Sequence, residues 1–317
     1  MVYSEKLPIK KEFSMEKYRI LLVGGAGTLG SDILAANLPN FTFFVVDDFK
    51  ESALTEIEVS KYCEYKNTNA ANKESIREVF SRFKPNVIVY LATTLSGDQN
   101  RALESNVLGL KNVILEASVD NHSHIVYIQS FLTRKTNDAI NEKTAIQARD
   151  SYSTWKLAGE FLLASYAGKR TTIILSSVIS PHLSVGAIPH FIKLISRNQP
   201  VVITDTYRDY LDPNSFIEAL QIVITDKLDI SEVVIGSGSN TSTENILSEV
   251  ANCLGKDLKN IQFKVTEPKA TDPKKIVLDF SLFQSITGWK PSLTLRDEIS
   301  AVIKNLETKE LKVRLHH

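Results

Sequence analysis

The sequence predicts an α/β protein with a Rossmann-type, doubly wound and mostly parallel sheet, followed by a smaller C-terminal α/β lobe. An apolar run from Tyr18 to Val23 breaks at once into regularly spaced glycines at Gly24, Gly27 and Gly30. Such glycines let the chain turn sharply, approach a pyrophosphate and bring the next helix close to the strand. A tight turn that binds nothing is the alternative, so the rest of the chain must decide between the two.

Strand-like and helix-like stretches then alternate along the chain, which is the second observation behind this fold class. Pro85 ends one helix just before a strand that begins at Val87. We expect residues 1–16 to form a polar extension, 17–180 a dinucleotide-binding domain, and 181–317 mainly a substrate-binding lobe interleaved with the last part of the sheet. The expected strands are 18–23, 41–46, 87–91, 125–129, 171–175 and 233–235, and the expected helices include 73–83 and 106–119.

The composition excludes several classes of function. Lys and Arg total 37, and so do Asp and Glu, which argues against nucleic acid or an anionic membrane surface as a partner. No apolar run approaches the ~20 residues that span a bilayer, and the N-terminus lacks the apolar block of a signal peptide, so we expect a cytoplasmic protein. We expect Cys63 and Cys253 to be reduced, no metal site among the six histidines, and His316-His317 to be the remnant of a purification tag.

Two carboxylates end the second expected strand. Asp47 and Asp48 follow the glycine loop by about twenty residues, where a dinucleotide site needs an acceptor for the adenosine ribose hydroxyls. A carboxylate there favours NAD because it repels the extra phosphate of NADP, although the nearby Lys50 leaves NADP open. For one of the two aspartates, a solvated turn is the alternative interpretation.

A tyrosine and a lysine further along the chain indicate acid–base chemistry. Tyr152 and Lys156 lie four residues apart in a helical stretch, so their side chains share one face. An ammonium beside a phenol lowers the phenol's pKa from about 10, and Lys156 can also bind the nicotinamide ribose. Ser130 follows the expected strand 125–129, at the sheet edge where such folds place their chemistry. A surface pair and a turn serine are the alternatives.

Together these segments resemble the extended short-chain dehydrogenase/reductase family, in its branch of nucleotide-sugar epimerases and dehydratases. The resemblance runs from about Tyr18 to about Leu306. The glycine loop resembles the family's cofactor loop, and Tyr152 with Lys156 resembles its catalytic pair. The segment 83–93 is similar to the strand and loop beneath the cofactor, and 106–117 is similar to the helix that follows.

The resemblance implies sets of site residues. Asn69 stands where the family usually has an Asp near the adenine, and Arg208 stands in the Arg-Asp-Tyr motif whose arginine clamps a diphosphate. The implied NAD contacts are Gly24, Gly27, Thr28, Leu29, Gly30, Asp47, Asp48, Asn69, Leu91, Ala92, Thr93, Asn106, Tyr152 and Lys156. The implied catalytic residues are Tyr152, Lys156 and Ser130, and the implied contacts to a nucleotide-diphosphate sugar are Ser130, Ser177, Arg208 and Lys269. The resemblance also implies a homodimer through the helices 106–119 and 152–166.

Departures from the family pattern narrow the reaction. Ser130 is followed by Phe131 and Leu132, where the family's dehydratases have an acidic pair, so dehydration lacks its acid and base. Ser177 and Ser180-Pro181 replace an Asn and a Gly-Pro on the substrate side. We therefore expect an NAD-dependent nucleotide-sugar epimerase, by default at C4. An NAD(P)H-dependent 4-keto-sugar reductase is the alternative, and an inactive dinucleotide-binding regulator is a third.

Overall fold

The computed structural model describes residues 17–94, 96–120, 122–136, 139–226, 228, 230–269 and 272–315. The expected extension at 1–16 and the closing His316-His317 lie outside these residues. No helix in the described part is long and apolar enough to cross a membrane.

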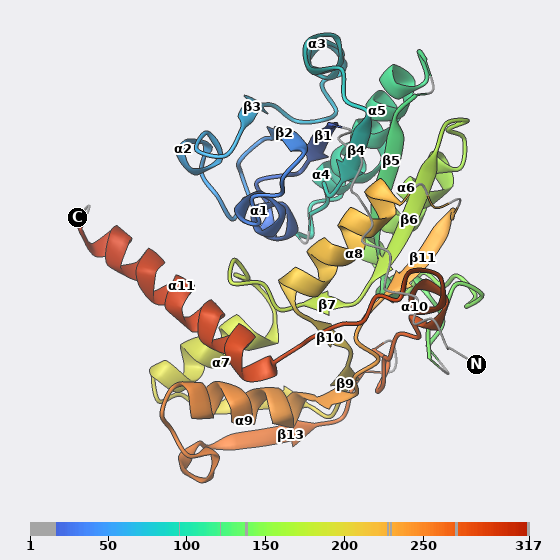
Figure 1. Cartoon of the computed structure of the whole chain (residues 1–317). Helices are drawn as coiled ribbons and strands as arrows, with labels where there is room; N and C mark the ends of the chain where they lie inside the picture. Colours follow the sequence, from blue (N-terminus) through green and yellow to red (C-terminus); the bar gives the residue numbers. More distant parts are fainter. Residues whose placement is uncertain are drawn as a thin grey trace, which may run out of the picture.

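A seven-stranded sheet forms the centre of the fold (Figure 1). Its strand order is β11-β6-β5-β4-β1-β2-β3, and every neighbouring pair runs parallel. The order reverses at β1, which pairs with β2 on one side and β4 on the other, so the carboxyl ends of β1 and β4 flank a crevice. The strands are β1 (Tyr18–Val23), β2 (Phe41–Asp47), β3 (Glu64–Asn67), β4 (Val87–Tyr90), β5 (His124–Ser130), β6 (Arg170–Leu175) and β11 (Glu232–Ile235).

This sheet confirms the predicted Rossmann-type fold. Six of its strands follow the apolar runs in the sequence, because strands covered by helices on both faces are apolar throughout. The strand β3 was not predicted, because it is short, polar and partly exposed at the edge of the sheet. An edge strand of that kind carries no apolar pattern that the sequence could show.

Helices cover both faces of the sheet. The helices α3 (Lys73–Phe83), α5 (Gly109–Ala117) and α6 (Ser151–Leu163) contribute to the core on one face. The helices α1 (Thr28–Ala35) and α8 (Pro213–Thr225) contribute to the core on the other. The bounds of α3 match the predicted helix 73–83, whose first turn is capped by the Asn72 side chain.

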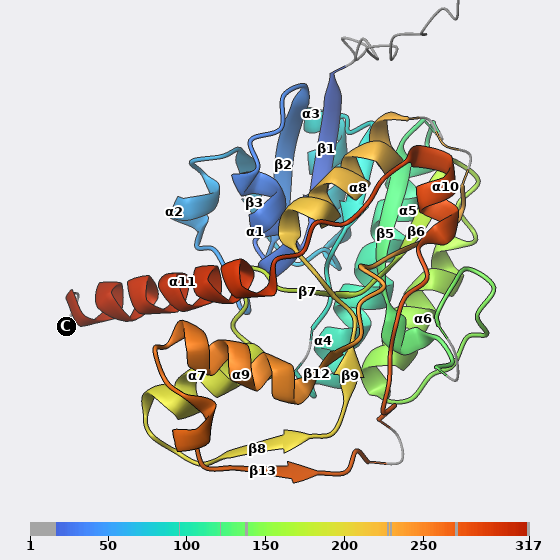
Figure 2. The same cartoon turned by 60° about the horizontal axis from the view of Figure 1, so that its bottom comes forward.

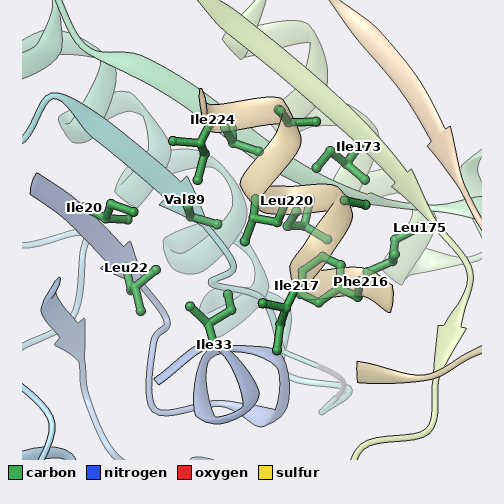
Figure 3. Packing of buried hydrophobic residues seen from close by; sticks show 14 of the residues in the cluster. Ile20, Leu22, Ile33, Val89, Ile173, Leu175, Phe216, Ile217, Leu220 and Ile224 are labelled. Carbon is green, nitrogen blue, oxygen red and sulfur yellow. The ribbon is translucent and has the colours of Figure 1, made fainter. Parts of the chain in front are cut away.

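The helix α8 shows how the second half of the chain returns to the sheet. Its N-terminus is fixed by Asp212, whose side chain accepts a hydrogen bond from Ser215 N, and by Pro213 at the first helical position. Phe216 and Leu220 then pack over the strands β1, β4 and β6 (Figure 3). The second half of the chain therefore contributes a helix that packs against the sheet.

A smaller lobe with its own core lies below the sheet (Figure 2). Its strands β8 (Val201–Thr204) and β13 (Phe263–Thr266) pair in parallel. Its helices are α7 (Ala187–Ser196), α9 (Thr243–Cys253) and α11 (Leu295–Leu315), and α11 extends away from the rest of the fold towards the C-terminus (Figures 1 and 2).

Short elements complete the fold. They are α2 (Glu56–Val59), α4 (Gln99–Leu103), the π-helical turn η1 (Glu104–Leu108), the 3-10 turns η2 (Phe131–Thr133) and η3 (Leu258–Asn260), α10 (Ser281–Thr287), and the paired strands β7 (Ser177–Val178) with β10 (Tyr210–Leu211) and β9 (Tyr207–Arg208) with β12 (Thr241–Ser242).

Cys63 and Cys253 are both free thiols, as predicted. Within the described ranges, no three His, Cys, Asp or Glu side chains are grouped so as to hold a metal ion.

Candidate active site

A cavity of about 750 Å³ lies at the carboxyl ends of β1, β2 and β4. This is the crevice that the reversal of strand order creates, where open α/β sheets bind their ligands. Of the residues that the sequence assigned to a cofactor, the cavity is lined by Gly24, Gly27, Thr28, Leu29, Gly30, Asp47, Asp48, Asn69, Leu91, Ala92 and Thr93.

The glycine loop forms a cradle that side chains would fill. Gly24 has a φ of +80°, and a Cβ built on it would lie 2.6 Å from Ala92 N. A Cβ on Gly30 would lie 2.3 Å from Gly25 O, so only glycine lets α1 approach the turn this closely. Gly27 is the N-cap of α1 and has no side chain to bind the first N–H groups, which therefore remain available to an anion. The cradle fits the diphosphate of a dinucleotide.

The Asp47 carboxylate is hydrogen-bonded to the glycine loop and to the segment after β2, which the sequence did not suggest. Its Oδ2 accepts from Ala26 N at 3.0 Å, and its Oδ1 accepts from Phe49 N at 2.9 Å and from Ser52 Oγ at 2.7 Å. Burial raises the pKa of this carboxyl, and the three hydrogen bonds oppose that shift. Asp47 therefore fixes the glycine loop against the end of β2, and ribose hydroxyls would have to share its remaining lone pairs.

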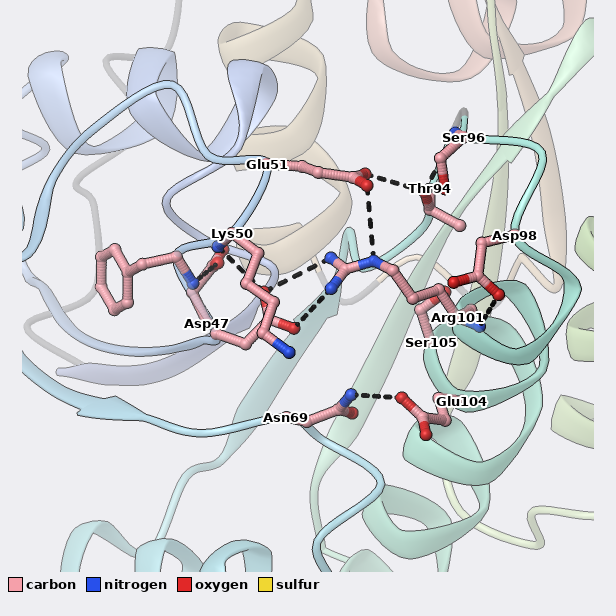
Figure 4. Close-up of polar contacts among 12 residues, drawn as sticks. Asp47, Lys50, Glu51, Asn69, Thr94, Ser96, Asp98, Arg101, Glu104 and Ser105 are labelled. Atoms are coloured by element: carbon pink, nitrogen blue, oxygen red, sulfur yellow. Dashed lines mark hydrogen bonds and ion pairs between the residues drawn. The ribbon is translucent and has the colours of Figure 1, made fainter.

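Asp48 and Asn69 both have side-chain partners within the protein, and Figure 4 shows Asn69 beside Glu104. Asp48 forms an ion pair with Arg101, at 3.1 Å between Oδ2 and Nη1, instead of lying in a solvated turn. The Asn69 Oδ1 accepts from Ala71 N at 2.9 Å, and its Nδ2 donates to Glu104 Oε2 at 2.7 Å. The Asn69 Oδ1, which would be the acceptor for an adenine amino group, thus already accepts a hydrogen bond from a backbone N–H.

Sequence reasoning missed several residues that line the cavity. They follow β2 and β4 or lie in the segment before α7, outside any motif, so only the strand order that joins these segments reveals them. They are Glu51, Ser52, Thr94, Ser96, Arg101, Ser105, Ser184 and Val185.

The structure brings Tyr152 and Ser130 together at the carboxyl end of β5, although neither residue lines the cavity. Asp150 caps α6 and accepts a hydrogen bond from Ser153 N at 2.7 Å, which places Tyr152 in the first turn. Ser130 ends β5, the strand next to β4, and its Oγ accepts from Leu132 N at 3.2 Å. Burial raises the pKa of the Tyr152 phenol to about 12, while a hydrogen bond with the Ser130 side chain acts in the opposite direction.

Lys156 is buried against strand β5. Its Nζ donates to Ile128 O at 2.6 Å and lies 4.5 Å from the centroid of the Tyr127 ring. Burial lowers the pKa of Lys156 to about 7, with the Glu160 carboxylate opposing the shift. The ammonium is therefore held against β5, because a buried cation needs a nearby acceptor more than an exposed one does.

Of the residues assigned to the cofactor, Asn106, Tyr152 and Lys156 are not among those that line the cavity. Asn106 is buried next to α6. It sits in the π-helical turn η1, is 1% exposed, and donates from Nδ2 to Ala102 O at 3.0 Å. Its backbone oxygen would lie 2.9 Å from a Cβ on Gly159. The glycine thus lets α6 pack closely against η1, which positions the helix that carries Tyr152 and Lys156.

On the substrate side, the predicted residues are spread out. The Arg208 Nη2 pairs with Asp272 Oδ1 at 2.6 Å, and its Nη1 donates to the backbone oxygens of Tyr207 and Pro273, so most of its donors are satisfied by protein. Burial lowers the pKa of this guanidinium. Ser177 is half-buried in β7, and Lys269 is exposed. Neither they nor Arg208 line the cavity described above.

A further arginine near this group carried no sequence motif. Arg149 donates from Nη2 to Arg134 O and to Thr136 Oγ1, and the charges of Asp272 and Arg208 act on its guanidinium. Arg208 pairs with Asp272 directly, and Arg149 is near enough to feel the same charge, although the two arginines are separated by about sixty residues of sequence.

Comparisons with known proteins show which family the chain belongs to. Residues 20–236 match the model of the NAD dependent epimerase/dehydratase family. The dTDP-4-dehydro-6-deoxyglucose reductase of Escherichia coli is 24% identical over 323 residues, 92% of this chain and 99% of the relative. The Bordetella bronchiseptica enzyme WbmG in complex with NAD and UDP has a TM-score of 0.83 at 26% identity, covering 93% of this chain and 96% of that one.

A UDP-glucose 4-epimerase from Thermotoga maritima with UDP-glucose has a TM-score of 0.78 at 19% identity, covering 92% of this chain and 99% of that one, which shows the shared fold. The family model names NAD as its cofactor, and the cradle of Gly24, Gly27 and Gly30 at the N-terminus of α1 fits the diphosphate of NAD. Because the family model matches more than half of the chain, the chain belongs to the NAD-dependent epimerase/dehydratase family.

Proposed function

We propose that the protein is an NAD-dependent epimerase of nucleotide-diphosphate sugars, acting by default at C4 through transient oxidation of a sugar hydroxyl. The observation that carries this proposal is the pairing of Tyr152 with Ser130 at the carboxyl end of β5, the strand next to β4, whose carboxyl end borders the cavity that fits NAD. WbmG, which was solved with NAD and UDP, and the UDP-glucose 4-epimerase of the same fold support the substrate class.

The chain's own residues have distinct roles in this proposal. When bound, NAD supplies a hydride acceptor and donor and, in its oxidised form, a positive charge near the phenol. The Gly24–Gly30 loop would hold the diphosphate, and Lys156 would bind the nicotinamide ribose with the hydrogens that Ile128 O does not take. Tyr152 would exchange a proton with the sugar hydroxyl at its Oη, and the Ser130 hydroxyl would orient both groups.

The diphosphate of the substrate would lie by the two arginines. Arg208 pairs with Asp272 and the charge of Asp272 also acts on Arg149, so a diphosphate that displaces this carboxylate would lie near two guanidinium groups. Planar guanidinium groups bind phosphate oxygens through paired donors. Ser177 and Lys269 remain proposed sugar-nucleotide contacts on the resemblance alone.

A second candidate is an NAD(P)H-dependent reductase of a nucleotide 4-keto sugar. It is favoured by the Escherichia coli reductase, which matches nearly the whole of both chains. The same Tyr152 would give its proton to the keto oxygen instead of removing one.

A dehydratase is not a candidate, because Phe131 and Leu132 stand after Ser130 where a dehydratase needs an acidic pair.

The two reactions differ in their use of cofactor. We expect the purified protein to release NAD on denaturation, and to interconvert two epimers from a panel of UDP-, dTDP-, GDP- and CDP-sugars without net formation or loss of NADH. Mass spectrometry of the released cofactor and chromatography of the sugars measure both outcomes. Stoichiometric consumption of NAD(P)H on a keto sugar, with no epimer formed, would instead establish the reductase.

The outer faces of α5 and α6 support a proposed homodimer. These helices expose large apolar side chains, of which Leu115 is 46% and Phe161 63% exposed. Isolated apolar residues on a surface are common, but one large exposed apolar side chain on each of two adjacent helices favours an interface. We expect Phe161→Glu to convert a dimer into a monomer in size-exclusion chromatography with light scattering. The control, Val202→Glu in the smaller lobe, also charges an exposed apolar site but should remain dimeric. A wild-type monomer would contradict the proposal.

A further inference from the structure

Asp48, Glu51 and Arg101 form a cluster of charged side chains that line the cofactor cavity, and Figure 4 shows Arg101 beside Glu51. Arg101 of α4 reaches across to the segment after β2, where its Nη1 and Nη2 lie 3.1 and 3.5 Å from the two carboxylate oxygens of Asp48. Its Nε lies 3.4 Å from Glu51 Oε1. Both edges of the guanidinium are therefore bound by carboxylates that belong to one loop.

Both sides of the cluster are held in place by further contacts. The Glu51 Oε2 accepts from Thr94 Oγ1 at 2.7 Å, which ties the carboxylate to the segment after β4. Arg101 lies in the short helix α4, where its backbone N donates to Asp98 Oδ1 at 3.2 Å. The Arg101 side chain is 24% exposed and that of Asp48 17% exposed, so water screens this ion pair only in part.

The cluster lies where the adenosine ribose of a dinucleotide is bound in this fold. Asp48 directly follows Asp47 at the end of β2, the position that accepts the ribose hydroxyls. Asp48, Glu51 and Arg101 all line the cavity, and among its described lining residues Arg101 is the only cation. Lys50 is exposed and does not line the cavity.

The charges at this edge determine which dinucleotide fits. A phosphate monoester such as the 2′-phosphate of NADP carries a charge of about −1.5 to −2 and binds arginine through paired hydrogen bonds. Here the guanidinium that could bind it already serves two carboxylates, and Asp47 adds a third negative charge. We propose that the Asp48–Arg101–Glu51 cluster makes the site select NAD over NADP by withholding Arg101 from the 2′-phosphate. This inference rests on the proposed placement of NAD in the cavity, and not on the reaction.

The test measures which dinucleotide the protein binds, independently of activity. Wild-type protein, Asp48→Asn/Glu51→Gln and Asp48→Asn/Glu51→Gln/Arg101→Gln are equilibrated with equimolar NAD and NADP. Free nucleotide is then removed, and the bound fraction is quantified by mass spectrometry after denaturation. We expect the NADP-to-NAD ratio of the double variant to exceed that of the wild type on the order of 10- to 100-fold. The triple variant, which lacks the released guanidinium, should lose most of that gain.

The outcomes separate this inference from the cofactor assignment. An equal ratio in the double and triple variants would show that Arg101 does not bind the 2′-phosphate, and would overturn the inference while NAD remained the cofactor. Failure to bind either dinucleotide in any protein would overturn both. The single variants Asp48→Asn and Glu51→Gln, checked by circular dichroism for the wild-type fold, should give intermediate ratios. Unchanged ratios in both would again overturn the inference.

Discussion

Replacement of Tyr152 by phenylalanine is expected to lower kcat about 10²- to 10⁴-fold for the proposed epimerisation. The change removes only the hydroxyl that would exchange a proton with the sugar, and leaves the ring that packs in the first turn of α6. Because burial raises the pKa of this phenol to about 12, the protein holds the proton on Tyr152 at neutral pH. Oxidation of the sugar needs the deprotonated form, so wild-type activity should rise from neutral to alkaline pH, and the residual activity of the variant should not.

The matched control for this prediction is Tyr62→Phe. Tyr62 is 50% exposed and does not line the cavity, so the loss of its hydroxyl should leave kcat within about twofold of the wild type. Retained NAD in Tyr152→Phe, measured by mass spectrometry, would show that the cofactor site remains intact. Wild-type kcat in Tyr152→Phe would contradict the assignment of Tyr152 as the acid–base group.

Replacement of Arg134 by methionine is expected to destabilise the protein by about 3–5 kcal/mol. Arg134 is 1% exposed, and its Nη2 binds Glu160 Oε1 at 2.7 Å and Glu232 Oε2 at 2.8 Å. Its Nη1 donates to Glu160 Oε2 at 3.2 Å and to Thr133 Oγ1 at 2.9 Å. Methionine fills similar space but leaves two partly buried carboxylates without their cation, which is why the loss is large.

The sign of the pH dependence follows from those carboxylates. Burial raises the pKa of Glu232, and Arg134 opposes that shift. Without Arg134, the pKa of Glu232 in the folded protein rises further above its value in the unfolded chain. The folded variant then binds more protons than the unfolded chain does, so its free energy of unfolding falls as pH increases. Urea unfolding should therefore show a larger loss at pH 7.5 than at pH 5.

Arg82→Met supplies the control for the ion pair. Arg82 pairs with Glu64, but both side chains are about 65% exposed, so its replacement should cost less than about 1 kcal/mol. Equal losses in Arg134→Met and Arg82→Met would contradict the role of the buried network.

Local patterns were sufficient for much of the fold. The bounds of α3 follow from the helical spacing of Ile76 and Val79 and from the cap at Asn72, all of which lie within a few residues of each other. The central strands follow from apolar runs that both faces of the sheet bury. These features could be predicted because the forces that produce them act between neighbours in sequence.

The contacts of the site residues could not be predicted in the same way. Arg101 meets Asp48 only because the strand order places β4 and β2 on either side of β1. The Lys156 ammonium binds the backbone of β5 at Ile128, and Gly159 of the same helix lets α6 pack closely against η1. Residue types in the sequence therefore indicated the chemistry, while packing between distant segments decided which acceptor each side chain binds.

The fate of the hydrogen on the reacting carbon tests the proposed epimerase most directly. A nucleotide sugar that the panel identifies as a substrate would be prepared with deuterium at C4 and incubated with the protein and its own bound NAD. The account predicts that the product epimer keeps the deuterium at C4, with no net reduction of the cofactor. Deuterium lost from C4 of the product epimer, or deuterium that accumulates on released cofactor with no epimer formed, would contradict it.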